Sequence, residues 1–139
     1  MKQTIAEQLA KHFNNLTYEK LPSESSAGMK RLLLDYLGVA LAGSCSESGK
    51  IGIRYARTVG KKAQSTLIGS GVRVTMEMAA FSNAISSHSI ELDDIDVLAL
   101  FHFSPPVCSA ALAVAEQAES SGKELLTALA AGCEMMERA

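Results

Sequence analysis

The stretch SESSAGMKRLLLDYLGVALAG, which spans residues 23–43, decides how this 139-residue chain folds. Leucines recur along it at the spacing of one helical face, and further apolar residues widen that face. The resulting arc is made of Leu33, Leu34, Leu37, Val39, Ala40 and Leu41. An arc this broad predicts a central, mostly buried helix that Ser23 caps at its start and Gly43 stops after Ala42.

Helical spacing also predicts shorter helices on both sides of this central stretch. Thr4 followed by Glu7 is a capping-box pattern, and Ser104 with two prolines after it is typical of a helix start. We expect these helices over residues 5–14, 50–59, 76–87, 107–120 and from about residue 123 onward. The β-branched runs around the glycine-rich turn 69–71 predict one small hairpin near residues 65–75. The expected fold class is all-α, with about six helices and one short β-hairpin.

The last helical pattern has no stop residue after it. The chain reaches Arg138 and Ala139 without a glycine, a proline or a polar tail. We therefore expect residues 1–139 to be a fragment of a larger helical domain.

Composition and charge exclude several classes of function. The net charge is -2 at pH 7 and the pI is about 5.9, so we expect no basic surface for nucleic acid or an anionic membrane. No apolar run approaches the roughly 18 residues of a transmembrane helix. The separated cysteines Cys45, Cys108 and Cys133 are typical of reduced thiols. These features predict a cytoplasmic protein without nucleic-acid or membrane partners.

Reactive side chains are concentrated between His88 and Ser104. This stretch holds two of the three histidines and four of the fifteen acidic residues, and no Lys or Arg lies between Val74 and Gly122. Crowded carboxylates can act as a general base because they raise one another's pKa. They can also bind a hard cation, or form a solvated loop that caps helix ends. The glycine that an EF-hand loop requires is absent, so we expect no metal site.

The two histidines of this stretch have different surroundings. His88 follows a predicted helix, where it can cap the C-terminus or take part in catalysis. His102 lies between two phenylalanines and before a predicted helix start, a setting that lowers a histidine's pKa and favours neutral imidazole. Both a proton-transfer role and a position in an aromatic core fit His102. Ser104 lacks the small-residue elbow of a serine hydrolase, so capping suits it better than nucleophilic attack.

Four segments together resemble the amino-terminal part of the MmgE/PrpD family of dehydratases, decarboxylases and epimerases. They are RLLLDYLGVALAGS at 31–44, STLIGSGVRV at 65–74, HSIELDD at 88–94 and HFSPPVCSAALAVAE at 102–116. The resemblance implies a large helical domain followed by a smaller lid domain that is absent from this chain. It also implies a homodimer and a cofactor-independent lyase or epimerase that moves a proton next to a carboxylate of a small di- or tricarboxylate.

The resemblance assigns roles to residues of the His88–Ser104 stretch. His102 would transfer the proton, and Glu91 and Asp93 would orient it or share the proton. The remaining matched residues, expected to bind substrate or anchor the loop, are His88, Asp94 and Ser104.

Three positions depart from the family pattern. Glu91 stands where the family has Asp, Ile95 where it has Thr, and Phe103 where it has Pro. A non-catalytic helical domain for oligomerisation or regulation is therefore the alternative function.

The segment without Lys or Arg contains seven acids, which repel a polycarboxylate. We expect the binding cations to come from elsewhere and this chain alone to be inactive.

Overall fold

The protein is an assembly of six α-helices and one small hairpin in the part that the computed structural model describes, residues 3–97 and 100–138. The helices are α1 (Ile5–Asn14), α2 (Ser23–Gly43), α3 (Glu47–Val59), α4 (Met76–His88), α5 (Ser109–Ala118) and α6 (Gly122–Arg138). A 3-10 turn covers Tyr18–Lys20, and a π-helical turn, Ser104–Cys108, leads into α5. Strands β1 (Ser65–Thr66) and β2 (Arg73–Val74) pair antiparallel. The predicted all-α class with a short hairpin is confirmed.

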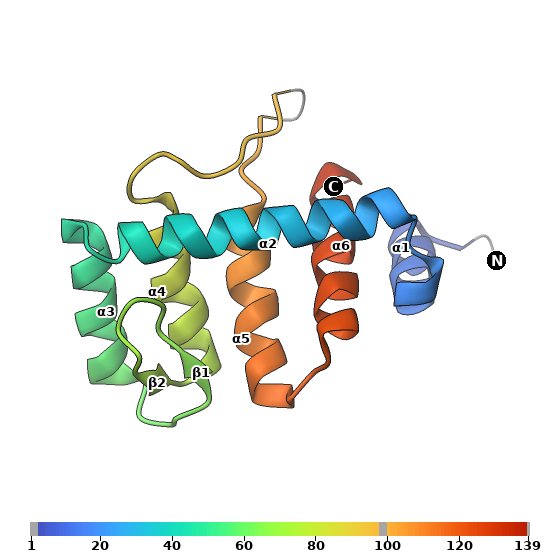
Figure 1. The fold of residues 1–139 in the computed structure, drawn as a ribbon. Coiled ribbons are helices and arrows are strands. Elements are labelled where there is room, and N and C mark those ends of the chain that lie inside the picture. The colour runs from blue at the N-terminus through green and yellow to red at the C-terminus, as the bar shows by residue number, and fades with distance from the viewer. Residues whose placement is uncertain (1–2, 98–99, 139) are drawn as a thin grey trace.

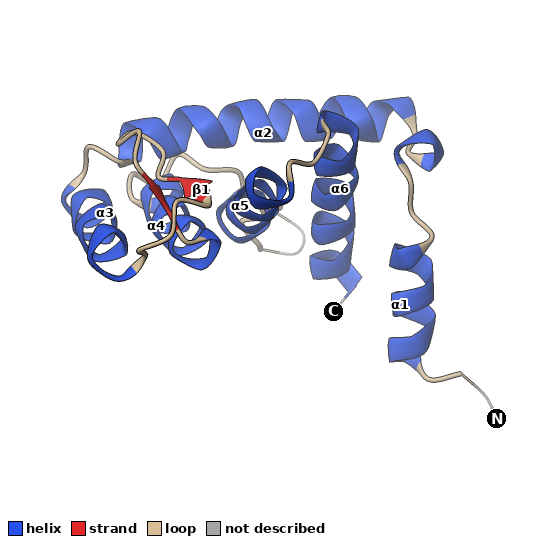
Figure 2. Ribbon diagram, turned by 90° about the horizontal axis from the view of Figure 1, so that it is seen from below, coloured by secondary structure: helices blue, strands red, loops and turns tan. Residues whose placement is uncertain are grey.

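Helix α2 is the long helix across which the other helices pack. Figure 1 shows α3, α4, α5 and α6 in a row across α2, and Figure 2 shows the same row from below. Helix α4 packs against α2, α3 and α5 and so occupies the middle of the row. The main core joins α2 to the π turn and α6 through Tyr36, Ala40, Val107, Cys108, Leu126 and Leu129. None of the helices in the described ranges combines the length and the apolar character that crossing a bilayer requires.

The prediction that α2 is mostly buried is wrong for one of its sides. Leu34 is 73% exposed and Leu41 is 56% exposed. Val39 and Ala40 of the predicted arc are buried, and the buried stripe continues through Tyr36 and Gly43 rather than through these leucines. The row of helices covers one side of α2, so leucines on its other side, such as Leu34, stay largely exposed among the described residues.

Helix boundaries differ from the predictions at three starts. Pro22, not Ser23, stands at the cap of α2, and no side chain caps it. Helix α3 begins at Glu47 rather than residue 50, because the hydroxyl of Ser46 accepts a hydrogen bond from the amide of Gly49 at 3.0 Å. The helix expected from residue 107 starts earlier, as the π turn that includes Pro105.

Close contact between backbones fixes the end of α4 that carries His88. A Cβ built on Gly43 of α2 would lie 1.9 Å from the carbonyl oxygen of Ser86 in α4. A Cβ on Gly49 of α3 would lie 2.2 Å from the carbonyl oxygen of Gly43. These two glycines therefore allow α2, α3 and α4 to meet at distances that no larger residue permits.

The hairpin also holds α4, through Asn83 in the second half of the helix. Asn83 of α4 accepts a hydrogen bond from the amide of Ile68 and donates one to the carbonyl of Thr66, both at 2.9 Å. Leu67 and Val74 of the hairpin are buried in a second core with residues of α3, α4 and α5. This packing stabilises the hairpin, because a two-stranded hairpin this small is marginally stable without helices that cover it.

Candidate functional site

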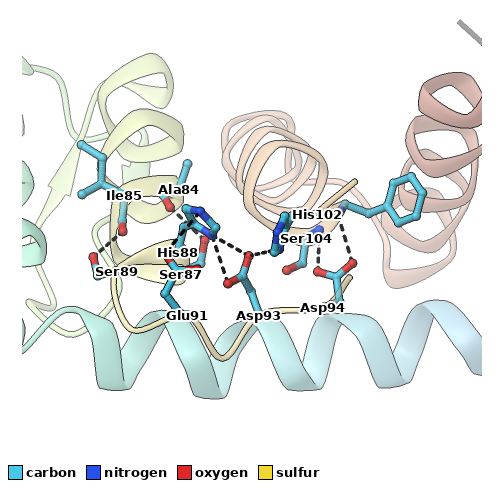
Figure 3. A network of polar contacts seen from close by, with 11 residues as sticks. Ala84, Ile85, Ser87, His88, Ser89, Glu91, Asp93, Asp94, His102 and Ser104 are labelled. Carbon is cyan, nitrogen blue, oxygen red and sulfur yellow. Dashed lines mark hydrogen bonds and ion pairs between the residues drawn. The ribbon is translucent and has the colours of Figure 1, made fainter. Parts of the chain in front are cut away.

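Asp93 joins the two histidines of the acidic stretch. The Nδ1 of His88 lies 2.8 Å from one carboxylate oxygen of Asp93 and 3.0 Å from the other. The Nδ1 of His102 approaches the same carboxylate at 3.0 Å from the opposite side. The two imidazole rings meet edge to face, with centroids 4.9 Å apart. Figure 3 shows Asp93 between the histidines, above the surface of α2.

Burial differs sharply within this His-Asp-His group, by which we mean His88, Asp93 and His102. The Asp93 side chain is 1% exposed, whereas His88 and His102 are 46% and 36% exposed. A shielded carboxylate needs donors, and an ionised carboxylate can only accept, so Nδ1 of His88 is the donor to Asp93. The group thus has a buried acidic centre and two accessible imidazoles.

The carboxylate of Asp93 also changes the proton affinity of His88. The hydrogen bond to Asp93 raises the pKa of His88 above its usual value, and this effect outweighs the lowering by partial burial. The negative charges of Asp93 and Glu91 raise it further. His102 is held differently. The Nδ1 atom of His102 is buried and lies close to Asp93, but the two groups are not aligned for a hydrogen bond. This nitrogen has no hydrogen-bond partner among the described residues.

Two features of the chain bring Asp93 back to His88 after α4 ends. His88 is the last residue of α4, which places its ring at the helix end. Three residues later, Glu91 has a φ of 53°, a left-handed conformation that is rare outside glycine and reverses the chain. Asp93, five residues after His88, then lies within reach of the His88 ring.

A separate contact brings His102 to the same carboxylate. Both oxygens of Asp94 accept backbone hydrogen bonds, from the amide of Phe103 at 3.0 Å and from that of Ser104 at 2.9 Å. The free amides at a helix start favour such an acceptor. Because Asp94 is adjacent to Asp93, anchoring the helix start also fixes His102 beside Asp93. An antiparallel bridge between Asp96 and Phe101 closes the base of the loop.

The other residues predicted for the site lie around this group. Glu91 is 77% exposed and reaches it from outside, with its carboxylate 3.7 Å from Nε2 of His88 rather than beside His102. Ser104 is fully buried, and its hydroxyl has no hydrogen-bond partner among the described residues. Asp94 already has both oxygens engaged. The geometry therefore gives Asp94 and Ser104 supporting positions, and their contact with a substrate stays a prediction.

An open pocket of about 620 Å³ lies beside the two histidines. Its lining is mainly apolar and includes Phe81 and Ile85 of α4 as well as Pro105 of the π turn. The sequence interpretation missed this apolar wall. The sequence contained a sign of it, because Phe81, Ile85 and His88 follow one another at i+4 and i+3 spacing and therefore share one face of α4. Lys and Arg are absent from the lining residues.

Side-chain atoms that can coordinate a metal ion lie close together in the His-Asp-His group. Within the described ranges, one donor atom each of His88, Asp93 and His102 can be chosen so that all three lie within 4.8 Å of one another. Of the four crowded acids considered from the sequence as cation ligands, Asp93 belongs to this set, whereas Glu91, Asp94 and Asp96 do not. Two imidazoles and a carboxylate form a different ligand class from an all-oxygen cluster.

Comparison with known proteins gives two matches. The model of the MmgE/PrpD N-terminal domain matches residues 7–139. The human protein cis-aconitate decarboxylase is 30% identical over 143 aligned residues, which cover 99% of this chain and 30% of the human protein. The chain thus spans about a third of the length of that relative. The family model covers nearly the whole chain, and the chain belongs to the MmgE/PrpD family.

Proposed function

We propose that this chain supplies one wall of the active site of a cofactor-independent lyase or epimerase acting on small di- or tricarboxylates. The observation that carries the proposal is the buried Asp93 carboxylate between two accessible imidazoles at the edge of a pocket. A positioned imidazole is the most common proton-transfer group at neutral pH. The relative's name, cis-aconitate decarboxylase, fits the proposed substrate class.

In this proposal His102 transfers the proton. Its Nδ1 faces Asp93, which leaves Nε2 as the nitrogen that takes hydrogen from a carbon next to a substrate carboxylate. In a dehydration or an epimerisation the C–H bond breaks and an N–H bond forms at Nε2. The electron pair left on carbon then forms a C=C bond while the hydroxyl group takes the proton from the imidazolium and leaves as water, or it takes a proton back. In a decarboxylation the C–C bond breaks, carbon dioxide leaves, and the electron pair left on carbon takes a proton from protonated His102. Asp93 stabilises the imidazolium that forms, as a buried carboxylate beside histidine does in other enzymes. His88 shares the charge of Asp93 and holds it in place.

The charge of the pocket limits what this chain can do by itself. A polycarboxylate placed beside Asp93 and Glu91 is repelled unless cations face it. The lining provides none, and its apolar wall of Phe81 and Ile85 offers no hydrogen bonds to carboxylates. We propose that Lys and Arg from further parts of the full-length protein or from a second subunit of a homodimer complete the site.

A substitution at His102 tests the catalytic assignment. In the full-length protein, His102→Asn should reduce turnover of its polycarboxylate substrate by at least ~100-fold, because general acid-base catalysis is lost. His12→Asn is the matched control, since His12 lies in α1 and pairs with Glu134 of α6 at 3.3 Å. Substrate panels followed by NMR measure both rates. Equal turnover of His102→Asn and wild type would remove His102 from the mechanism.

A non-catalytic domain is the second candidate. The longer Glu91, which lies 3.7 Å from His88 on the outside of the group, and the exposed apolar Ile95 stand where the family has Asp and Thr. Thermal-shift measurements with di- and tricarboxylates on the full-length protein separate the candidates. A melting temperature that rises with one of these compounds supports the enzyme, whereas no rise with any of them, together with no turnover, supports the oligomerisation or regulatory role.

A further inference from the structure

We propose that His88, Asp93 and His102 form a binding site for a divalent transition-metal ion such as Zn²⁺. The ion would have three protein ligands, with the remaining coordination position open to the adjacent pocket. This site does not depend on the enzymatic proposal, because it requires only the ligand atoms and their arrangement.

The distances within the group are close to those of a metal centre. Zn²⁺ binds imidazole nitrogen and carboxylate oxygen at about 2.0–2.2 Å, so tetrahedral ligand atoms lie roughly 3.3 Å apart. The Nδ1 atoms of His88 and His102 lie 2.8 and 3.0 Å from Asp93 oxygen. The widest separation in the three-atom set is within 4.8 Å. The two histidine nitrogens thus lie near the expected ligand separation from Asp93, and the three-atom set has to close only slightly to share one ion.

The types of ligand select the class of metal. Imidazole suits Zn²⁺, Cu²⁺, Ni²⁺ and Fe²⁺, whereas Mg²⁺ and Ca²⁺ require oxygen ligands. A site with two imidazoles and one carboxylate leaves coordination positions free, as catalytic metal sites do. The 620 Å³ pocket lies on the side of His88 and His102, so solvent can reach the free position.

Two neighbouring features favour an ion here over a simple ion pair. Nδ1 of His102 is buried and has no aligned hydrogen bond with any described residue, so a metal ion that displaces the proton from this nitrogen breaks no hydrogen bond. Glu91 lies 3.7 Å from Nε2 of His88, the nitrogen opposite the one that faces Asp93. A carboxylate behind the second nitrogen of a ligand histidine orients the ring and raises its basicity in metal sites.

The placement of the metal has a consequence that rests on the proposed function. A bound ion occupies Nδ1 of His102 and the carboxylate of Asp93, so Asp93 can no longer stabilise a protonated His102. We therefore expect Zn²⁺ to inhibit proton transfer by the full-length protein, with its inhibition reversed by a chelator.

Isothermal titration of the 139-residue chain with ZnCl₂ tests the site directly. One bound ion per chain is expected, and His102→Asn and Asp93→Asn should each weaken binding by at least about 10-fold, because each removes a ligand. His12→Asn is the control, since His12 has a single carboxylate partner, Glu134, in the described contacts. Circular dichroism checks that each variant is folded.

Cys45 needs its own control, because an exposed thiol can bind Zn²⁺. Co²⁺ substituted for Zn²⁺ should give visible absorption without a thiolate charge-transfer band, and Cys45→Ser should leave the affinity unchanged. The proposal is overturned if wild type binds no ion, if folded His102→Asn and Asp93→Asn bind as tightly as wild type, or if Cys45→Ser abolishes binding. Unchanged Zn²⁺ affinity without inhibition of turnover would contradict the proton-transfer assignment and leave the metal site intact.

Discussion

Asp93 determines the chemistry of the site because a single shielded carboxylate serves two imidazoles. Its negative charge is compensated by the N–H of His88 on one side and by His102 on the other. Removing either histidine leaves the remaining partner to satisfy a carboxylate that is 1% exposed. The three residues therefore act as one unit, and their contributions to activity are expected to be non-additive.

The raised pKa of His88 makes a prediction about pH and stability. A pKa that is higher in the folded than in the unfolded protein favours folding below the ordinary value of about 6.5, and this contribution is lost as pH rises through the folded pKa. Replacing His88 with Gln should therefore destabilise the chain more at about pH 5.5 than at about pH 9. The difference should be roughly 0.2–1 kcal/mol, since solvent screens an imidazole that is 46% exposed.

Urea unfolding of wild type and His88→Gln, with a chelator present, measures this difference. Parallel stability curves for the two proteins across that pH range would show that the Asp93 contact does not change the proton affinity of His88.

The sequence singled out the residues that the structure brings together in the candidate site, but it did not predict their pairing. Each histidine and acid of the group stood within a short stretch, so their concentration was visible. Which carboxylate bridges the histidines depends on the left-handed backbone of Glu91 and on the Asp94 contact with the amides of Phe103 and Ser104. These features arise in a loop without periodicity, where local sequence does not determine the path of the backbone.

At the scale of elements, the contact of α2 with α4 depends on Gly43. Gly43→Ala would place a methyl group 1.9 Å from the carbonyl oxygen of Ser86. The backbones must separate, so we expect a loss of about 1–3 kcal/mol in the free energy of unfolding. Gly38 of the same helix has no neighbour within 4 Å of such a methyl group, and Gly38→Ala should stabilise the chain by roughly 0.5–1 kcal/mol.

Thermal and urea unfolding of the two variants provide the comparison. Equal effects of the two substitutions would contradict the assigned close contact at Gly43, because both replace glycine by alanine inside one helix.

Helix existence was predictable, whereas helix burial was not. Capping residues, glycines and apolar spacing located all six helices to within a few residues, because these signals act locally. Burial of α2 followed different residues from those expected. Leu34 and Leu41 face outward, while Tyr36, Ala40 and Gly43 face the row of helices. Small residues permit close approach of a neighbouring helix. The predicted arc of α2 contains both small and large apolar residues, so the sequence does not show which of them the neighbouring helices cover.

At the scale of the whole molecule, helix α2 has one side covered by the other helices and one exposed side. Leu34, Leu37 and Leu41, which follow one another at helical spacing in α2, are 73%, 37% and 56% exposed. Apolar side chains in such number favour a partner surface. We propose that a second copy in the homodimer covers α2, and Leu34→Asp should then shift the mass of the full-length protein measured by light scattering from dimer toward monomer. A wild-type protein that is monomeric at micromolar concentration would contradict this assembly.

Hydrogen exchange at a substrate carbon tests the proton-transfer assignment most directly. The full-length protein is incubated with a small tricarboxylate in D₂O, and NMR follows deuterium incorporation at the carbon next to a carboxylate. We predict exchange by wild type and by His12→Asn, and a loss of at least ~100-fold in His102→Asn. Exchange by folded His102→Asn at the wild-type rate would contradict the claim that the His-Asp-His group moves the proton.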